Sequence, residues 1–238
     1  MTTRISTSSP RRLARMAALF LLLTILLGTF AQAFVSERLI VFRDASATAT
    51  NILAHKGLFR LGFTIYLIEM ACQVTTAVLF YQLLKPVNKT VALLSLFLEV
   101  TGCVIKTVAR VFYIAPLFVL RPGGWEGFSA EQLHSMALVL LKVNDSGAGV
   151  ALAFFGFSSA LGGYLIFRST FLPRWLGALS FIAGLGWLTF LYRPLGDLAF
   201  PIGALLGLGT AAATIFWLLV FGVNEERWVQ RPASPAPV

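Results

Sequence analysis

Six ionisable residues lie within long apolar stretches of this chain, where a charge is expected to be paired, hydrated or functional. Three are acids and three are bases: Glu69, Glu99, Asp145, Lys106, Arg110 and Lys142. A charged side chain at the centre of a membrane costs about 2.5–3.5 kcal/mol on insertion scales, so such residues pair or face a polar cavity. The equal numbers of the two signs favour mutual neutralisation.

The spacing of these residues places them on helix faces. Along the apolar stretch that begins at Thr90, small or polar residues recur every three or four positions. They are Ala92, Ser95, Glu99, Cys103, Lys106, Arg110 and Tyr113. The next long stretch carries a second stripe, Lys142, Asp145, Gly149, Ala153, Gly156, Ala160 and Gly163. Small residues at this spacing let helix backbones approach closely, so charge and packing share one face.

Two interpretations of these charges remain open. In the first, an outward-facing polar pocket among the second, third and fourth spans binds or passes a small charged ligand or ion. Its residues would be Glu69, Gln73, Glu99, Lys106, Arg110, Lys142 and Asp145. In the second, the charges form sealed ion pairs, and the protein is a structural, sensory or partner-binding membrane protein without a ligand. The expected pairs are then Glu99 with Lys106, and Asp145 with Lys106 or Arg110.

The sequence offers little support for an enzyme. Its two histidines, His55 and His134, have no metal-ligand spacing, so no metal site is predicted. Ser158 follows Gly156-Phe157, but no later span carries a histidine to act as its base. No C-x-x-C pair or phosphate-binding loop is present. We therefore predict no catalytic residue and no cofactor. An intramembrane enzyme with a carboxylate as acid or base is the less favoured alternative.

The composition indicates an integral membrane protein. Hydrophobic residues make up 58% of the 238 positions and charged residues 12%, whereas soluble domains have about 45–50% and about 25%. The formal net charge of +9 could suggest nucleic acid. The basic residues, however, cluster at the ends of apolar stretches and not on one soluble face, so lipid is the expected partner and nucleic acid is not.

The apolar stretches predict an all-α, polytopic transmembrane bundle of about six spans. The spans are expected at about 14–34, 58–84, 90–113, 142–167, 175–191 and 198–222 within a domain covering 14–223. A basic segment, 1–13, precedes this domain, and a tail, 224–238, is predicted to be disordered. Short surface helices are expected at Ala45–His55, capped by Asp44 and closed by Gly57, and at 130–140.

The distribution of Lys and Arg predicts that both termini lie in the cytoplasm. The cytoplasmic side then holds Arg4, Arg11, Arg12, Arg15, Lys85, Lys89, Arg168, Arg174, Arg227 and Arg231. The outer side holds Arg38, Arg43, Lys56, Arg60, Arg121 and Arg193. Ala31-Gln32-Ala33 also fits a signal-peptide cleavage site. A retained first span is preferred, because it gives an even number of spans.

Four segments carry a resemblance to a known family. They are Arg38–Gly62, Leu84–Lys89, Gly163–Ser169 and Phe171–Gly177. Together they resemble domain-of-unknown-function family 4386, bacterial integral membrane proteins of about six spans. The resemblance covers roughly Arg12 to Val223 and implies a multi-pass protein of the bacterial inner membrane with its first span retained. It implies no activity, cofactor or oligomeric state.

Overall fold

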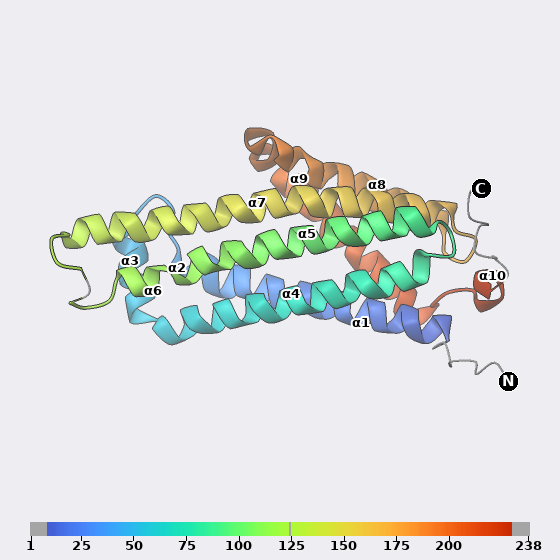
Figure 1. The fold of residues 1–238 in the computed structure, drawn as a ribbon, viewed down its shortest axis with the longest axis horizontal. Helices are drawn as coiled ribbons and strands as arrows, with labels where there is room; N and C mark the ends of the chain where they lie inside the picture. The colour runs from blue at the N-terminus through green and yellow to red at the C-terminus, as the bar shows by residue number, and fades with distance from the viewer. Residues whose placement is uncertain (1–8, 124, 230–238) are drawn as a thin grey trace. The chain divides into compact units, whose positions relative to one another are not determined.

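A computed structural model describes residues 9–123 and 125–229, and these residues are helical with no strand (Figure 1). Six helical segments are long and apolar enough to cross a membrane. They are Pro10–Leu39, Lys56–Leu84, Lys89–Val119, Ala130–Arg168, Arg174–Leu191 and Arg193–Val220. The predicted all-α architecture with about six spans is confirmed.

The spans keep their apolar surfaces on the outside, as a membrane requires. At most 39% of the most apolar window of any span is buried within the protein. Large side chains such as Leu198 and Leu205 are more than two-thirds exposed, at 79% and 74%. Exposed apolar area on this scale is unfavourable in water and is stable against lipid. The chain is therefore a multi-pass membrane protein.

The first span is longer than predicted at both ends. Helix α1 (Pro10–Thr29) continues through a π-helical segment, η1 (Phe30–Ser36), into the short α2 (Glu37–Leu39). The sequence placed the end of this span near Phe34. A π-helical segment changes which side chains share a face, so a pattern based on 3.6 residues per turn does not follow it.

The helix cap predicted at Asp44 is present, and the helix end predicted at Gly57 is not. Asp44 Oδ1 accepts a hydrogen bond of 2.9 Å from the amide of Ala47 and starts α3 (Ala45–Ala54). Gly57 does not close α3, because the backbone already breaks at His55 and α4 (Lys56–Leu84) includes Gly57.

Ser129 and Gln132 cap each other's backbone amides at 3.2 and 2.8 Å. The helix that follows, α7 (Ala130–Arg168), is unbroken, so the predicted surface helix at 130–140 is the first part of a 39-residue helix.

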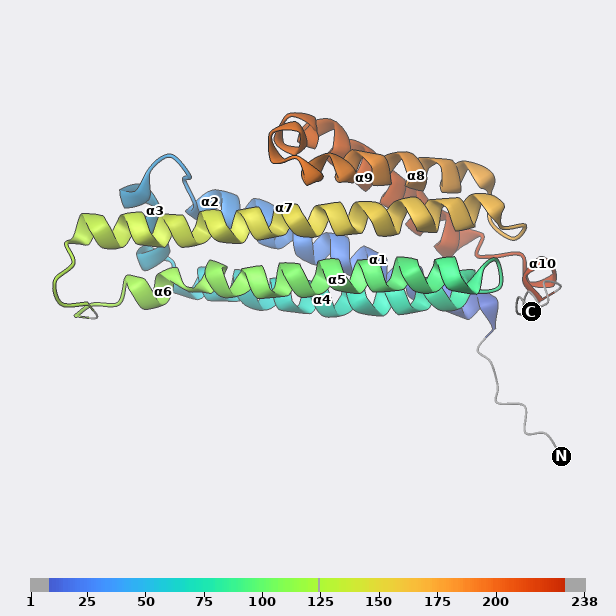
Figure 2. The same cartoon turned by 45° about the horizontal axis from the view of Figure 1, so that its top comes forward.

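The remaining helices complete the six spans. Helix α5 (Lys89–Ile114) breaks at Ala115, and α6 (Pro116–Val119) follows. The fifth span comprises α8 (Arg174–Leu188) and a 3₁₀ turn, η2 (Thr189–Leu191). The sixth is α9 (Arg193–Val220), which lies beside α8 (Figures 1 and 2).

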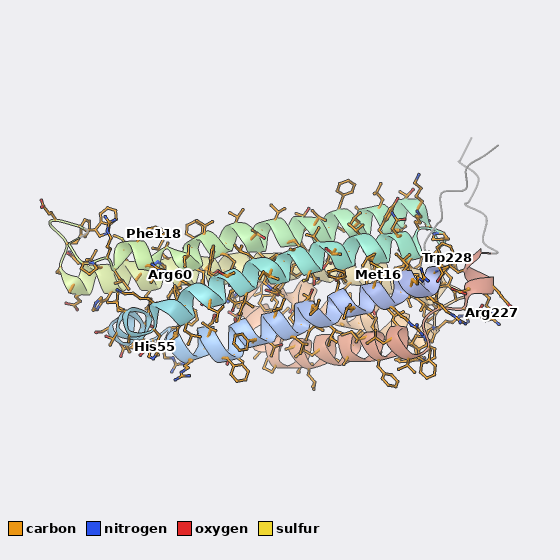
Figure 3. The ribbon with its side chains drawn as sticks, turned by 90° about the horizontal axis from the view of Figure 1, so that it is seen from below. Met16, His55, Arg60, Phe118, Arg227 and Trp228 are labelled. Carbon is orange, nitrogen blue, oxygen red and sulfur yellow. The ribbon has the colours of Figure 1, made fainter. Side chains whose placement is uncertain are left out.

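The start of the predicted disordered tail is instead a helix, α10 (Glu225–Val229). The side chain of Asn224 caps it by accepting from the amide of Arg227 at 3.1 Å. Trp228, labelled in Figure 3, donates from Nε1 to the carbonyl oxygen of Leu83 at 2.9 Å. This partly buried contact holds a segment that composition alone assigns to disorder. Residues 230–238 lie outside the described residues.

Contacts divide the chain into two compact units. Unit 1 comprises Met1–Leu22, Gln73–Gly102 and Leu152–Val238, and unit 2 comprises Leu23–Cys72 and Cys103–Ala151. The core of unit 1 includes Leu83, Leu165, Leu176 and Leu218. The core of unit 2 includes Val35, Ile52, Phe59, Tyr66, Tyr113 and Leu141.

Candidate functional site: a buried polar cluster in unit 2

A buried ion pair joins α4 to α5 in unit 2. Lys106 Nζ lies 2.8 Å from Glu69 Oε1. Glu69 is 5% exposed, and the side chain of Lys106 is 17% exposed. A Cβ added at Gly28 of α1 would lie 2.8 Å from Glu69 Oε1, so a glycine at this position leaves room for the carboxylate. At these distances and this degree of burial, the two charges neutralise each other.

Arg110 lies on the same face of α5, four residues after Lys106. It is 5% exposed. Its Nη1 donates to Asn144 Oδ1 on α7 at 3.1 Å, and its Cζ lies 3.5 Å from the ring centroid of Tyr66 on α4. Within the described chain, no carboxylate lies within 4.0 Å of this guanidinium. Arg110 therefore faces an amide and an aromatic ring, whereas Lys106 faces an acid.

Two tyrosines connect this face of α4 and α5 to the π-helical segment η1. Tyr66 donates its hydroxyl hydrogen to Gln32 Oε1 at 2.8 Å and lies 3.0 Å from Ser36 Oγ. Ser36 Oγ donates to the hydroxyl of Tyr113 at 3.4 Å. Buried hydroxyls need such partners. The network fixes the ring of Tyr66 beneath the guanidinium of Arg110.

Close packing of α5 against α7 positions Asn144 beside Arg110. A Cβ added at Gly147 would lie 2.7 Å from the Cβ of Ala109. Gly147 and Asn144 are three residues apart, so they share a face of α7. The short approach at Ala109 thus places the amide of Asn144 against the residue that follows Ala109 on α5.

Two polar atoms of this cluster are buried without a partner. Among the described residues, Glu69 Oε2 and Arg110 Nε have no hydrogen bond. More than nine in ten buried polar groups in proteins are paired with protein atoms or water. The cluster therefore offers one cationic donor and one carboxylate acceptor to water or to a bound species.

The structure divides the predicted site residues between the two units. Glu69, Lys106 and Arg110 come together in unit 2, and Asp145 lies half-buried next to Asn144 with an interaction of its own. Lys142 is exposed on α7. Gln73 and Glu99 belong to unit 1, where Gln73 Nε2 donates to Glu99 Oε1.

The predicted ion pairs are replaced by others. Lys106 pairs with Glu69 on α4. Arg110 bonds to the amide of Asn144, and not to the neighbouring Asp145. The partner of each base lies on another helix, Glu69 on α4 and Asn144 on α7.

Five residues of the cluster were not among the predicted pocket residues: Gln32, Ser36, Tyr66, Asn144 and Tyr113, of which Tyr113 had been placed on the polar stripe with Lys106 and Arg110. Tyr66 and Tyr113 lie three residues from Glu69 and Arg110, so helical spacing was a usable signal for both. Gln32 and Ser36 reach the cluster from a π-helical segment, for which the sequence gives no such signal.

These features define a class of protein: a six-span membrane protein with apolar outer surfaces and a polar cluster buried among its helices. The chain belongs to the family described as domain of unknown function (DUF4386), whose profile matches residues 16–222. The resemblance seen in the sequence is thus confirmed, and the matched residues include the whole polar cluster.

A curated protein with a similar sequence is an uncharacterized protein of Archaeoglobus fulgidus. It is 28% identical over 187 residues, which are 76% of this chain and 99% of that protein. No solved structure matches the chain.

Proposed function

We propose that this protein binds a small anion at Arg110, inside the polar cluster of unit 2. We further propose that it does so in the plasma membrane, the inner membrane in bacteria, with both termini in the cytoplasm. The observation that supports anion binding is the environment of Arg110, which is 5% exposed; among the described residues no acid lies within 4.0 Å of its guanidinium, and its Nε has no hydrogen-bond partner.

A bound anion would offset the cost of burying the charge of Arg110. An arginine in a protein is always protonated. Removing such an ion from water costs several kcal/mol unless an opposite charge and hydrogen bonds compensate. Asn144 supplies one hydrogen bond and Tyr66 supplies a ring face. A small anion accepting from Nε would supply the missing charge.

Glu69 contributes to the same proposal as an acceptor. Its Oε1 is used by Lys106, while its Oε2 has no donor among the described residues. A water that accompanies the anion, or a ligand that carries a proton, would donate to Oε2. A hydrated or hydroxyl-bearing anion therefore has the chemistry to accept from Arg110 Nε and to donate to Glu69 Oε2.

The test is anion-dependent thermal stability of the purified full chain. Unfolding would be followed at constant ionic strength in sodium chloride, formate, nitrate or phosphate, with bulky gluconate as the reference. An anion present at 100 times its Kd stabilises by about 2.7 kcal/mol. Arg110→Met should remove the response, and Lys142→Gln, which removes an exposed cation from α7, should keep it.

The Arg110→Met protein also tests the proposal without any ligand. Methionine fills a similar volume without a charge, so the variant should fold and be as stable as the native chain in gluconate, or more stable. Loss of anion stabilisation in a folded Arg110→Met protein supports the proposal. If no small anion stabilises the native protein above gluconate, or if Arg110→Met responds equally, Arg110 is not an anion site.

One observation favours a second function. The 2.8 Å contact of Glu69 with Lys106 is complete as an ion pair and needs no ligand. Under this alternative the cluster only fixes the register of the helices of unit 2, and the protein is a structural, sensory or partner-binding membrane protein. It predicts no anion response in any variant, together with a stabilising effect of Arg110→Met.

A further inference from the structure

A pocket lies at one end of unit 2, and none of its lining residues belongs to the buried polar cluster. Its volume is about 520 Å³, and it lies where α4 begins and where α5 and α6 end. Arg60 and Phe118, both labelled in Figure 3, contribute to its wall. The residues of the wall divide into a cationic group and an apolar group.

The cationic group consists of Lys56, Arg60 and Arg121. All three side chains are exposed, and within the described chain none of them forms a hydrogen bond or an ion pair. The described residues that line the pocket include no acid. Three unneutralised cations around one cavity create a positive potential that favours an anionic group.

The apolar group includes Phe63 and Phe118. Phe63 lies seven residues after Lys56 on α4, which is about 10 Å along the helix axis. Phe118 is 64% exposed on α6. The pocket therefore combines charged groups near the start of α4 with aromatic surface deeper along the same helix.

The ends of the spans place this pocket at the level of lipid headgroups. Lys56 is the first residue of the second span, and the third span ends at Val119. Trp125 is 50% exposed and donates from Nε1 to the carbonyl oxygen of Phe118 at 3.3 Å. Exposed tryptophan at the end of a span is typical of the membrane–water interface.

We propose that this pocket binds the headgroup of an anionic phospholipid. Lys56, Arg60 and Arg121 contact the phosphate and any further anionic oxygen, and the first methylenes of an acyl chain pack on Phe63 and Phe118. The proposal does not depend on anion binding at Arg110, because the two sites share no residue.

The arrangement of the pocket favours a lipid over free phosphate. A free phosphate would use the cations and leave the exposed ring of Phe118 without a partner, whereas a phospholipid matches both parts. It also favours an anionic over a zwitterionic lipid, because three cations repel a choline or ethanolamine nitrogen. Each basic residue near a membrane surface strengthens binding to anionic lipid by about fivefold.

The experiment measures lipid binding by native mass spectrometry of the full chain released from detergent. Phosphatidylglycerol and phosphatidylcholine with the same acyl chains would be added in equal amounts. We expect phosphatidylglycerol to remain bound preferentially. Arg60→Gln and Arg121→Gln should each lower that preference about fivefold, and together about 25-fold. Arg43→Gln, which removes an exposed arginine of unit 2 outside the pocket, should leave it unchanged.

A second arm separates the two sources of phosphate. Inorganic phosphate at millimolar concentration should not displace phosphatidylglycerol, because it lacks the apolar part. Equal retention of the two lipids would overturn the proposal, as would the same loss in Arg43→Gln as in Arg60→Gln. Displacement by inorganic phosphate would overturn the lipid assignment and identify the pocket as a phosphate site. Thermal unfolding of each variant checks that a lost preference is not a lost fold.

Discussion

The two units of this protein hold their helices together by opposite means. In unit 1, α7 packs on α8 through glycines: a Cβ added at Gly163 would lie 2.5 Å from the amide nitrogen of Phe181, and one at Gly177 would lie 2.4 Å from that of Phe167. In unit 2, α4 meets α5 through the ion pair of Glu69 with Lys106. Close backbone contact joins α7 to α8 in unit 1, whereas in unit 2 a buried ion pair joins α4 to α5 in addition to the packing of Gly147 against Ala109.

The two modes leave different amounts of polar surface unpaired. In unit 1, Ser159 on α7 donates to the carbonyl oxygen of Ser180 on α8 at 3.0 Å, so a hydroxyl at this contact is paired. In unit 2, Glu69 Oε2 and Arg110 Nε have no partner among the described residues. Glycine contacts stabilise a helix bundle and leave no polar group in need of a partner. A charged cluster with unpaired polar atoms costs stability, which makes it a candidate for function. The comparison therefore assigns packing to unit 1 and a candidate function to unit 2.

The largest expected effect comes from breaking the ion pair in unit 2. Glu69→Gln keeps the shape of the side chain and leaves Lys106 buried without an acid. Removing one partner of a buried pair costs about 3–5 kcal/mol. The free energy of unfolding would be measured by titrating the protein in mixed micelles with sodium dodecyl sulfate.

A double replacement separates two contributions to the free energy of unfolding: the cost of one unpaired buried charge, and the stabilisation given by the ion pair. Glu69→Leu combined with Lys106→Met removes both charges, and it should recover most of the lost stability. Cys103, a thiol of unit 2 that is 2% exposed, reports on the same region in a Cys72→Ser background. Its reaction with a small thiol reagent should accelerate in Glu69→Gln and stay slow in the double variant. Equal instability of the single and double variants would show that the charges themselves stabilise unit 2.

A smaller effect is expected from crowding the glycine contact in unit 1. Gly163→Ala introduces a Cβ against the backbone of α8, and overpacking of this kind costs about 1–3 kcal/mol. Gly209→Ala on α9 is the matched control, because a Cβ there meets nothing within 4 Å. The measurement is again unfolding in mixed micelles.

The reaction rate of Cys103 with a thiol reagent tests whether strain in unit 1 leaves unit 2 unchanged. Gly163→Ala should leave the reaction rate of Cys103 unchanged, because the strain lies in unit 1 and Cys103 lies in unit 2. A faster reaction of Cys103 in Gly163→Ala than in Gly209→Ala would mean that the two units unfold together and that the comparison describes one cooperative body.

The helices could be predicted from the sequence. So could the placing of Lys106 and Arg110 on one face of α5. Long apolar stretches and side-chain caps such as Asp44 act locally, so hydropathy predicted the six spans and a cap residue predicted the start of α3. Lys106 and Arg110 were placed on one face because α5 is a regular helix. The small residues of α7 were correctly interpreted as a packing face at Gly156 and Gly163, which both meet α8.

The pairing of charges could not be derived in the same way, because it depends on which helices become neighbours. Lys142 shows the limit of the stripe on α7: it lies 21 residues before Gly163, and a seven-residue spacing drifts about 20° per repeat on a straight helix. Over three repeats the drift is about 60°, and Lys142 is exposed while Gly163 is buried. Gln32 and Ser36 were missed because the π-helical turn that carries them leaves no periodic signal.

The smallest expected effect tests the hydroxyl contact of unit 1 against the ion pair of unit 2. Ser95 Oγ donates to the carbonyl oxygen of Ser158 at 3.0 Å, and Ser158 Oγ donates to that of Ser95 at 2.9 Å. Hydrogen bonds between membrane helices average about 0.6 kcal/mol in double-mutant cycles, because side chains find other partners when the helices separate. A cycle of Ser95→Ala, Ser158→Ala and the double variant should give a coupling of about this size. A coupling as large as that of Glu69 with Lys106 would mean that both units depend on polar contacts, and the glycines of α7 and α8 would then be permissive and not the cause of cohesion in unit 1.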